Sequence, residues 1–72
     1  MRYLHSDPDI LGGEVVIRGT RVPIDTLLWR LKDGYSLDRI QEMYNWVDRE
    51  TLQGAINEVL DAAIGALPKP SR

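Results

Sequence analysis

The 72-residue sequence contains no cysteine. This absence excludes disulfide bonds, thiolate zinc sites and cysteine nucleophiles. The sequence also has no apolar run near the roughly 18 residues that a membrane span needs. Its first segment, MRYLHSDPDI, has acidic side chains where a signal peptide requires an apolar stretch. We therefore expect a cytoplasmic protein with no membrane partner.

Positive charge is not in excess either. Nine Lys and Arg residues stand against eleven Asp and Glu residues, which gives a net charge of −2 and a pI near 5.2. Domains that hold nucleic acid by bulk attraction usually have a basic face and a high pI. The charge balance argues against that mode of binding, most clearly for residues 37–72, which carry six acidic and four basic side chains.

The length of the chain limits its core. A chain of this size forms one domain, and it buries only about 60% of the surface that its unfolded form exposes. Such a domain is marginally stable unless something supplements its core. Because disulfides are excluded, we expect a second copy or a partner chain to do so, and we predict a homodimer.

Residues 1–22 predict a short β element. The segment 14–22 is rich in β-branched side chains, follows Gly12-Gly13 and is interrupted by Gly19. This pattern indicates an extended strand or a small hairpin. Because one hairpin is too small to fold alone, it must pack on helices or pair across a dimer.

A first helix is predicted directly after this element. Apolar side chains recur with the helical period from Ile24 to Leu31. Pro23 suits the first turn of a helix, and Gly34 suits the left-handed residue that follows its end.

Two further helices are expected before the C-terminal prolines. Ser36 is a natural cap for a second helix of about nine residues. Asp48 is a natural cap for a third helix, whose apolar stripe continues to Leu67 until Pro68 ends it.

The predicted fold class is therefore mainly α. A β element at 1–22 precedes a three-helix bundle at 23–67 and a polar tail at 68–72. The turn at 45–47 joins the last two helices with helix-turn-helix spacing. Any small three-helix bundle contains such a pair, so this spacing alone does not establish DNA binding.

Few side chains suit catalysis. In an extended segment, His5, Asp7 and Asp9 alternate and could resemble a metal triad, although the same residues are ordinary in a turn. Glu58 and Asp61 are three residues apart and could share an acid-base task, although two carboxylates on a solvated helix face are commoner. We therefore expect no enzymatic activity, no catalytic residues, no metal site and no cofactor.

Two arginines suit the binding of anions. Arg18 and Arg21 flank a flexible glycine at the end of the apolar strand, and two guanidiniums in this arrangement can bind carboxylates or phosphates. Pairing with Glu14, Asp25 or a helix C-terminus explains them equally well. Both alternatives remain open.

The third helix is a poor electrostatic match for DNA. Between Asp48 and Leu67 it has four acidic side chains and one basic one, so phosphates repel it. Base contacts would have to come from its N-terminal end, where recognition helices read bases. A solvated helix face has a similar composition. The candidate DNA contacts are Arg39 from the second helix and Arg49, Thr51, Gln53 and Asn57 from the third.

Both tryptophans are candidate interface residues. Trp29 lies about 140° from Ile24 around the first helix, outside its apolar stripe. Trp46 lies in the turn before the third helix. Aromatic side chains outside a core are often anchors for partners. For Trp29 the alternative is that the β element covers it within one chain.

Several strings along the chain resemble one family. The strings are Gly12-Gly13, Val16-Ile17-Arg18-Gly19-Thr20-Arg21-Val22-Pro23, Leu27-Leu28, and Gly34-Tyr35-Ser36 followed by Ile40 and Tyr44. Together they resemble a small bacterial and archaeal family of domains of unknown function, regarded as predicted antitoxin components of toxin-antitoxin modules. The resemblance covers roughly residues 7–64.

This resemblance implies a homeodomain-like helix-turn-helix behind a short β element, usually dimeric and encoded beside a nuclease-like toxin of the PIN type. The connection Asn45-Trp46 departs from the family, which more usually has a proline there. None of the shared motif positions brings a catalytic role. They are Gly13, Ile17, Arg18, Gly19, Thr20, Arg21 and Pro23.

Two functions follow as hypotheses. The first is an antitoxin that neutralises a PIN-type toxin and can also regulate its operon by binding operator DNA. Such nuclease sites cluster carboxylates around Mg²⁺, so Arg18 or Arg21 could enter the cluster and replace the charge of the metal. The alternative is a helix-turn-helix regulator that binds DNA without a toxin partner.

Overall fold

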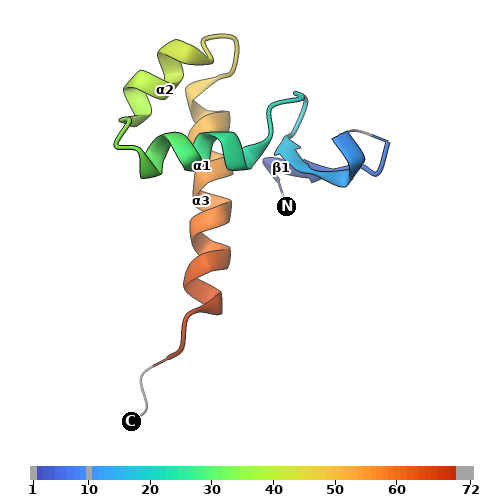
Figure 1. The fold of residues 1–72 in the computed structure, drawn as a ribbon, viewed down its shortest axis with the longest axis vertical. Helices are drawn as coiled ribbons and strands as arrows, with labels where there is room; N and C mark the ends of the chain where they lie inside the picture. Colours follow the sequence, from blue (N-terminus) through green and yellow to red (C-terminus); the bar gives the residue numbers. More distant parts are fainter. Residues whose placement is uncertain (1, 10, 70–72) are drawn as a thin grey trace.

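A computed structural model describes residues 2–9 and 11–69. The chain is mainly helical, as expected: a two-stranded antiparallel hairpin is followed by three helices (Figure 1). No helix in the described ranges combines the length and apolar character needed to cross a bilayer. The elements are β1 (Leu4–Ser6), a 3-10 turn (Leu11–Gly13), β2 (Val15–Ile17), α1 (Ile24–Lys32), α2 (Leu37–Met43) and α3 (Arg49–Ala66).

The hairpin pairs two segments that are well separated in the sequence. Leu4 lies opposite Ile17 and Ser6 lies opposite Val15. The strand predicted within 14–22 is therefore confirmed, but its main partner is β1. After β2 the chain makes a second, tighter turn. In it, Ile17 N donates to the Val22 carbonyl at 2.9 Å, and Gly19 has a φ of +82°.

The helix boundaries follow the predicted caps. The α1 helix begins directly after Pro23, and Gly34 follows its end with a φ of +94°. The Ser36 hydroxyl accepts a hydrogen bond from the Arg39 backbone N at 3.1 Å, which caps α2. This helix has seven residues rather than about nine, since Tyr44 leaves the helical conformation with a φ of −122° and a ψ of 53°.

The third helix begins after Asp48, as predicted. The Asp48 carboxylate makes no capping hydrogen bond there. At the other end, Leu67 is the extended residue that terminates the helix, one position before Pro68.

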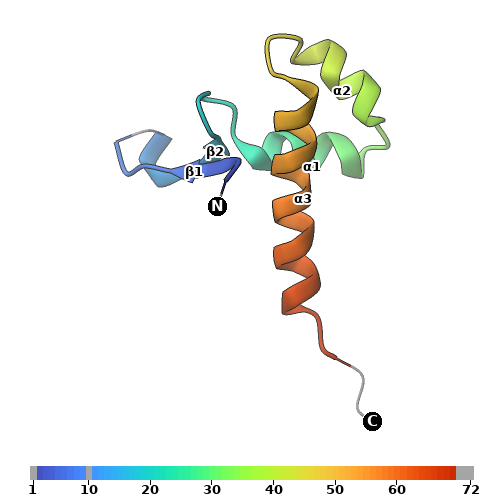
Figure 2. The ribbon, with the colours of Figure 1, turned by 180° about the vertical axis from the view of Figure 1, so that it is seen from behind.

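The core lies where all the elements meet. Its side chains come from the hairpin, the residues before α1, all three helices and the α2–α3 connection. None of the described polar or charged residues is buried. The first half of α3 passes through this core, and its second half extends away from it (Figures 1 and 2). The buried residues are Leu4, Val16, Ile17, Val22, Ile24, Leu27, Ile40, Val47, Leu52, Ala55 and Ile56.

A carboxylate of α3 holds the start of the hairpin. Glu58 Oε1 accepts hydrogen bonds from the backbone N of Arg2 and of Tyr3, both at 2.7 Å. The Tyr3 hydroxyl also donates to Glu50 Oε1 at 3.3 Å. The N-terminal strand is thus attached to the helix that ends the fold.

Candidate functional site

Arg18 is part of the hairpin. Its backbone N donates to the Tyr3 carbonyl at 2.9 Å. Its guanidinium donates to the carbonyls of Arg2 at 3.0 Å and of Leu4 at 3.1 Å. Because successive carbonyls of a strand point in opposite directions, the Leu4 carbonyl faces away from β2. The Arg18 side chain therefore reaches the outer edge of β1, and its donors stabilise the strand.

Arg21 is placed differently. It is exposed on the turn after β2 and makes no hydrogen bond or ion pair with any other described residue. The turn itself is ordered by Thr20, whose hydroxyl donates to the Ile17 carbonyl at 2.8 Å and accepts from Val22 N at 3.0 Å. Of the two predicted anion-binding arginines, Arg18 therefore stabilises the hairpin, and Arg21 can reach a ligand.

The candidate DNA contacts lie on α2 and on the first half of α3. Arg49, Gln53 and Asn57 share one exposed face because they are spaced four residues apart. Gln53 Nε2 donates to Asn57 Oδ1 at 3.0 Å. Arg49 forms an exposed ion pair with Asp38 of α2 at 2.6 Å.

The two remaining DNA candidates are less available. Arg39 pairs with Glu42 one turn along α2 at 3.4 Å, and both side chains are exposed. Thr51 is half-buried. Four of the five candidates thus already have a polar partner within the chain, and in two of these pairs the partner is an acid.

Both tryptophans are on the surface. Trp29 is 59% exposed and Trp46 is 65% exposed. The β element therefore does not cover Trp29. The Lys32 ammonium lies 4.3 Å from the centre of the Trp29 ring, and Trp46 packs edge-on against Tyr44 with ring centres 5.4 Å apart. These contacts orient the rings and leave most of their surface in solvent.

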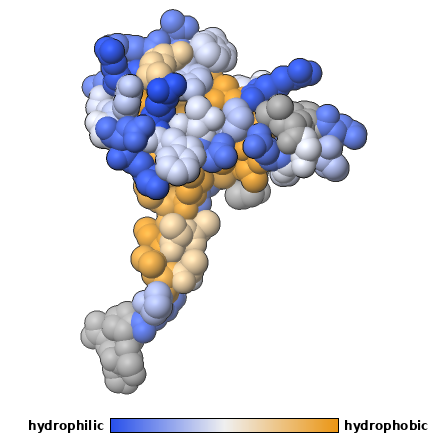
Figure 3. Space-filling view, viewed as in Figure 1, coloured by the Kyte–Doolittle hydropathy of each residue, from blue (hydrophilic) through white to orange (hydrophobic). Residues whose placement is uncertain are grey.

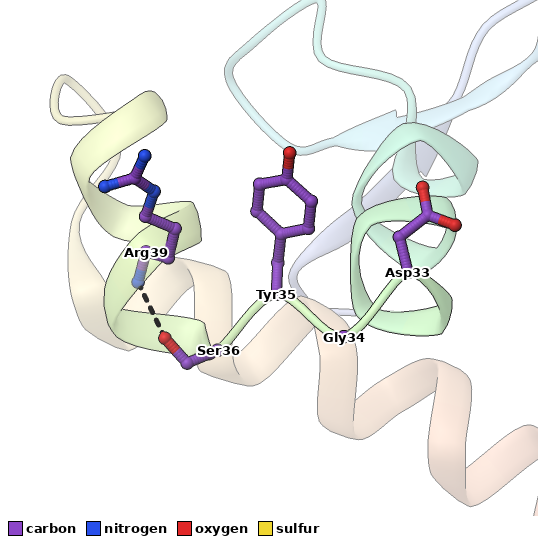
Figure 4. A pocket seen from close by; sticks show the side chains of 5 residues that line it. All are labelled: Asp33, Gly34, Tyr35, Ser36 and Arg39. Atoms are coloured by element: carbon purple, nitrogen blue, oxygen red, sulfur yellow. Dashed lines mark hydrogen bonds between the residues drawn. The ribbon is translucent and has the colours of Figure 1, made fainter.

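An open hollow between α1 and α2 has no counterpart in the sequence predictions (Figure 4). The Ser36 hydroxyl in its lining is used as the α2 cap. Arg30 lies over the neighbouring Tyr35 ring, with its guanidinium carbon 5.5 Å from the ring centre. The Ser36 hydroxyl donates to no basic side chain among the lining residues, so the hollow has no nucleophile-base pair. Its lining residues are Asp33, Gly34, Tyr35, Ser36 and Arg39.

Two of the acidic candidates, Asp7 and Glu58, have structural roles. Asp7 Oδ1 accepts from Asp9 N at 2.9 Å, as in an ordinary turn. Glu58 points to the start of the hairpin, whereas Asp61 is exposed. In residues 2–9 and 11–69, no three side chains of His, Asp or Glu are grouped closely enough to hold a metal ion.

Comparison with known proteins identifies the family. A family model described as "Protein of unknown function (DUF433)" matches residues 4–57. The chain belongs to the DUF433 family. It is also 42% identical over 48 residues to "Uncharacterized protein y4eO" of Sinorhizobium fredii (strain NBRC 101917 / NGR234). That match covers 67% of this chain and 22% of the relative, so the chain spans about a fifth of the relative's length. No solved structure matches.

The limits of the DUF433 match coincide with a structural boundary. Residues 4–57 include the hairpin, α1, α2 and the half of α3 that passes through the core. The match stops where α3 leaves the bundle, next to Glu58. The free half of α3 is therefore a feature of this chain outside the DUF433 match.

Proposed function

We propose that this DUF433 chain is a non-enzymatic binding protein of antitoxin type, whose partner is a PIN-type nuclease toxin. The observation that carries the proposal is the exposure of both tryptophans. Tryptophan is the side chain most enriched at the energetic centres of protein interfaces, and a small domain with a limited core gains stability by burying it. The family resemblance supports the toxin class.

Arg21 is the side chain that we assign to the active site of the toxin. It is exposed and unpaired within the described part of the chain, whereas the Arg18 guanidinium is engaged by β1. A guanidinium entering a cluster of carboxylates gains charge-assisted, bidentate hydrogen bonds and competes with Mg²⁺ for them. Hydrolysis then stops because the metal no longer positions or activates water.

Coexpression tests this proposal. The tagged chain is produced with the product of its adjacent gene, and the mass and ratio of the purified chains are measured together with nuclease activity. We expect a small nuclease-like chain in fixed ratio. Trp29→Ala or Trp46→Ala should weaken its recovery, and Arg21→Ala should weaken inhibition.

Arg39→Ala is the matched control, because it removes another exposed arginine from a different surface. Inhibition should survive this substitution. Full inhibition by Arg21→Ala would reject the assigned mechanism. Recovery of this chain alone would reject the antitoxin proposal itself.

A second candidate function is DNA binding, either as autoregulation or without any toxin. It is favoured by the order of α2 and α3 and by the exposed face that Arg49, Gln53 and Asn57 share. Binding to the upstream duplex should then weaken steeply as salt increases, because cations are displaced from the phosphates. Undetectable binding at low salt would exclude this function.

A further inference from the structure

The hollow between α1 and α2 lies in a polar part of the surface. Figure 3 shows hydrophilic residues gathered over these two helices, whereas the hydrophobic surface follows the underside of the bundle and the second half of α3. The hollow has a volume of about 490 Å³, within the range of about 300 to 1,000 Å³ that is typical of ligand sites. Gly34 adds no side chain to its lining, and no atom lies within 4 Å of a Cβ built there. A ligand in this open hollow would be recognised mainly by charge and hydrogen bonds.

Tyr35 gives the hollow a fixed aromatic ring. Its half-buried side chain packs against the core, and the Arg30 guanidinium lies over the ring. The Tyr35 hydroxyl, in contrast, makes no hydrogen bond with any described residue. The neighbouring Gly34 and Ser36 are explained by the end of α1 and the cap of α2. Packing needs only the ring at position 35, so the hydroxyl is available to a ligand.

Two opposite charges flank this ring. Arg39 of α2 lies on one side of it, and Asp33 at the end of α1 lies on the other (Figure 4). The Asp33 carboxylate makes no hydrogen bond or ion pair with a described residue. Arg39 pairs with Glu42 at 3.4 Å, with both side chains exposed. An exposed pair of this kind contributes little, so a ligand can replace it. The hollow therefore presents an anion and a cation on either side of the Tyr35 ring.

This arrangement fits a peptide better than a nucleic acid or a small molecule. Asp33 and Glu42 repel phosphates. The open shape does not enclose a small molecule on most sides, as ligand pockets do. An extended peptide, in contrast, presents alternate side chains on one face. An acidic, an apolar and a basic side chain at alternate positions can therefore meet Arg39, Tyr35 and Asp33.

We propose that this hollow binds an extended segment of a partner protein in which an acidic and a basic side chain flank an apolar one at alternate positions. Arg39 binds the acid through charge-assisted hydrogen bonds, and Asp33 binds the base. Tyr35 packs against the apolar side chain and donates its hydroxyl to a peptide carbonyl. The site does not include the side chains assigned to the toxin, so neither proposal rests on the other. Because exposed ion pairs are weak, an isolated segment should bind with a Kd on the order of 1 mM.

Titration of the ¹⁵N-labelled full chain with blocked pentapeptides, followed by NMR, tests the proposal. The mixed-charge probes are acetyl-Glu-Thr-Leu-Thr-Lys-amide and the reversed acetyl-Lys-Thr-Leu-Thr-Glu-amide. The control probes have two glutamates or two lysines at the same positions. At least one mixed-charge probe should shift the amide resonances of residues 33–36 and 39 saturably, with an affinity about threefold or more above both controls. No saturable shift up to about 20 mM, or equal affinity for all four probes, would overturn the proposal.

Substitutions identify the side chains that bind. Arg39→Ala and Asp33→Asn should each weaken binding of the mixed-charge probe about threefold, because each removes one of its ion pairs. Tyr35→Phe keeps the ring and removes the hydroxyl, so it should weaken binding about twofold or more. Asp61→Asn and Lys69→Gln remove the same charges elsewhere on the chain and should leave the affinity unchanged. The same spectra show whether each variant is folded.

A short single-stranded oligonucleotide of mixed sequence distinguishes the two classes of macromolecule. It should not shift the resonances of the hollow. Binding of the oligonucleotide there without binding of a mixed-charge peptide would reject the proposal, as would equal losses in the control variants. In the coexpression test above, Arg39→Ala should leave toxin inhibition intact. Failure of this site and failure of the antitoxin proposal are therefore distinguishable.

Discussion

Tyr3 lies directly against α3 at Gly54. A Cβ atom at position 54 would be 2.4 Å from Cδ2, 2.5 Å from Cε2 and 2.7 Å from Cγ of the Tyr3 ring. Such distances are far shorter than van der Waals contact. The overlapping atoms include Cγ, the ring atom nearest the backbone, so rotation of the ring alone cannot relieve the overlap. The absence of a side chain at Gly54 is what allows β1 to approach the helix.

Gly54→Ala should therefore destabilise the fold although alanine is the better helix former. The gain in helix propensity of at most about 1 kcal/mol is opposed by displacement of Tyr3, for a net loss of about 1 to 3 kcal/mol. Urea unfolding measures the difference. Gly65→Ala is the control, because no atom lies within 4 Å of its added Cβ. It should leave stability unchanged or raise it by up to about 1 kcal/mol. Equal effects at both positions would contradict the Tyr3 contact.

Arg18→Ala and Arg21→Ala should separate structure from binding. The first removes two hydrogen bonds to the carbonyls of Arg2 and Leu4, and at an exposed site we expect a loss of about 1 kcal/mol. The second removes no hydrogen bond or ion pair within the described chain and should change stability by less than about 0.5 kcal/mol. Denaturant midpoints and amide exchange in β1 measure both effects. Faster exchange in Arg21→Ala alone would contradict this assignment.

Ser36→Ala should cost more stability than Asp48→Ala. Ser36 accepts a hydrogen bond from Arg39 N, and loss of such a cap costs about 1 kcal/mol. Asp48 has the cap position without the hydrogen bond, so its substitution removes only a favourable charge at the helix N-terminus, worth about 0.3 to 1 kcal/mol and screened by salt. Thermal unfolding at low and high salt compares them. The cost at Asp48 should decrease with salt, while the cost at Ser36 should not.

Asp38→Asn tests whether the face of Arg49 can bind DNA. The pair between them is exposed on both sides, so its loss should change stability by less than about 1 kcal/mol. The substitution releases Arg49 and removes a negative charge. If this face binds DNA, affinity for the upstream duplex should increase, and its dependence on salt should become steeper. Fluorescence anisotropy across a salt series measures both quantities, with Asp61→Asn as a control for the same charge change on the free half of α3.

The helices could be predicted from the sequence because their signals are local. Periodic apolar residues, Pro23, Gly34 and Ser36 each act within a few positions, and the structure confirms the resulting boundaries except for the shorter α2. The strand β1 has no such signal. It is three residues long, and its position depends on Ile17, on Glu58 and on the space above Gly54, all distant in the sequence.

In the candidate sites, too, local features could be predicted from the sequence, whereas features that depend on contacts between distant residues could not. The exposure of Trp29 follows from its place on α1, outside the apolar stripe. The bond from Arg18 to the Leu4 carbonyl requires the hairpin register, which no local pattern specifies. The stripe of α3 is uniform along the sequence, so periodicity alone could not indicate that full burial ends at Ile56 and that Leu60 and Ile64 are exposed. The antitoxin, DNA-binding and dimer assignments stay predictions.

The attachment of the hairpin to α3 has a consequence for biosynthesis. Domains generally fold as units during synthesis, and the start of this hairpin gains its contacts with α3 only after Glu58 has been synthesised. Most of the domain must leave the ribosome before Tyr3 can pack against α3. During that interval, Leu4 and the apolar side chains of β2 remain uncovered, and the nascent chain is most open to chaperones and proteases before translation is complete.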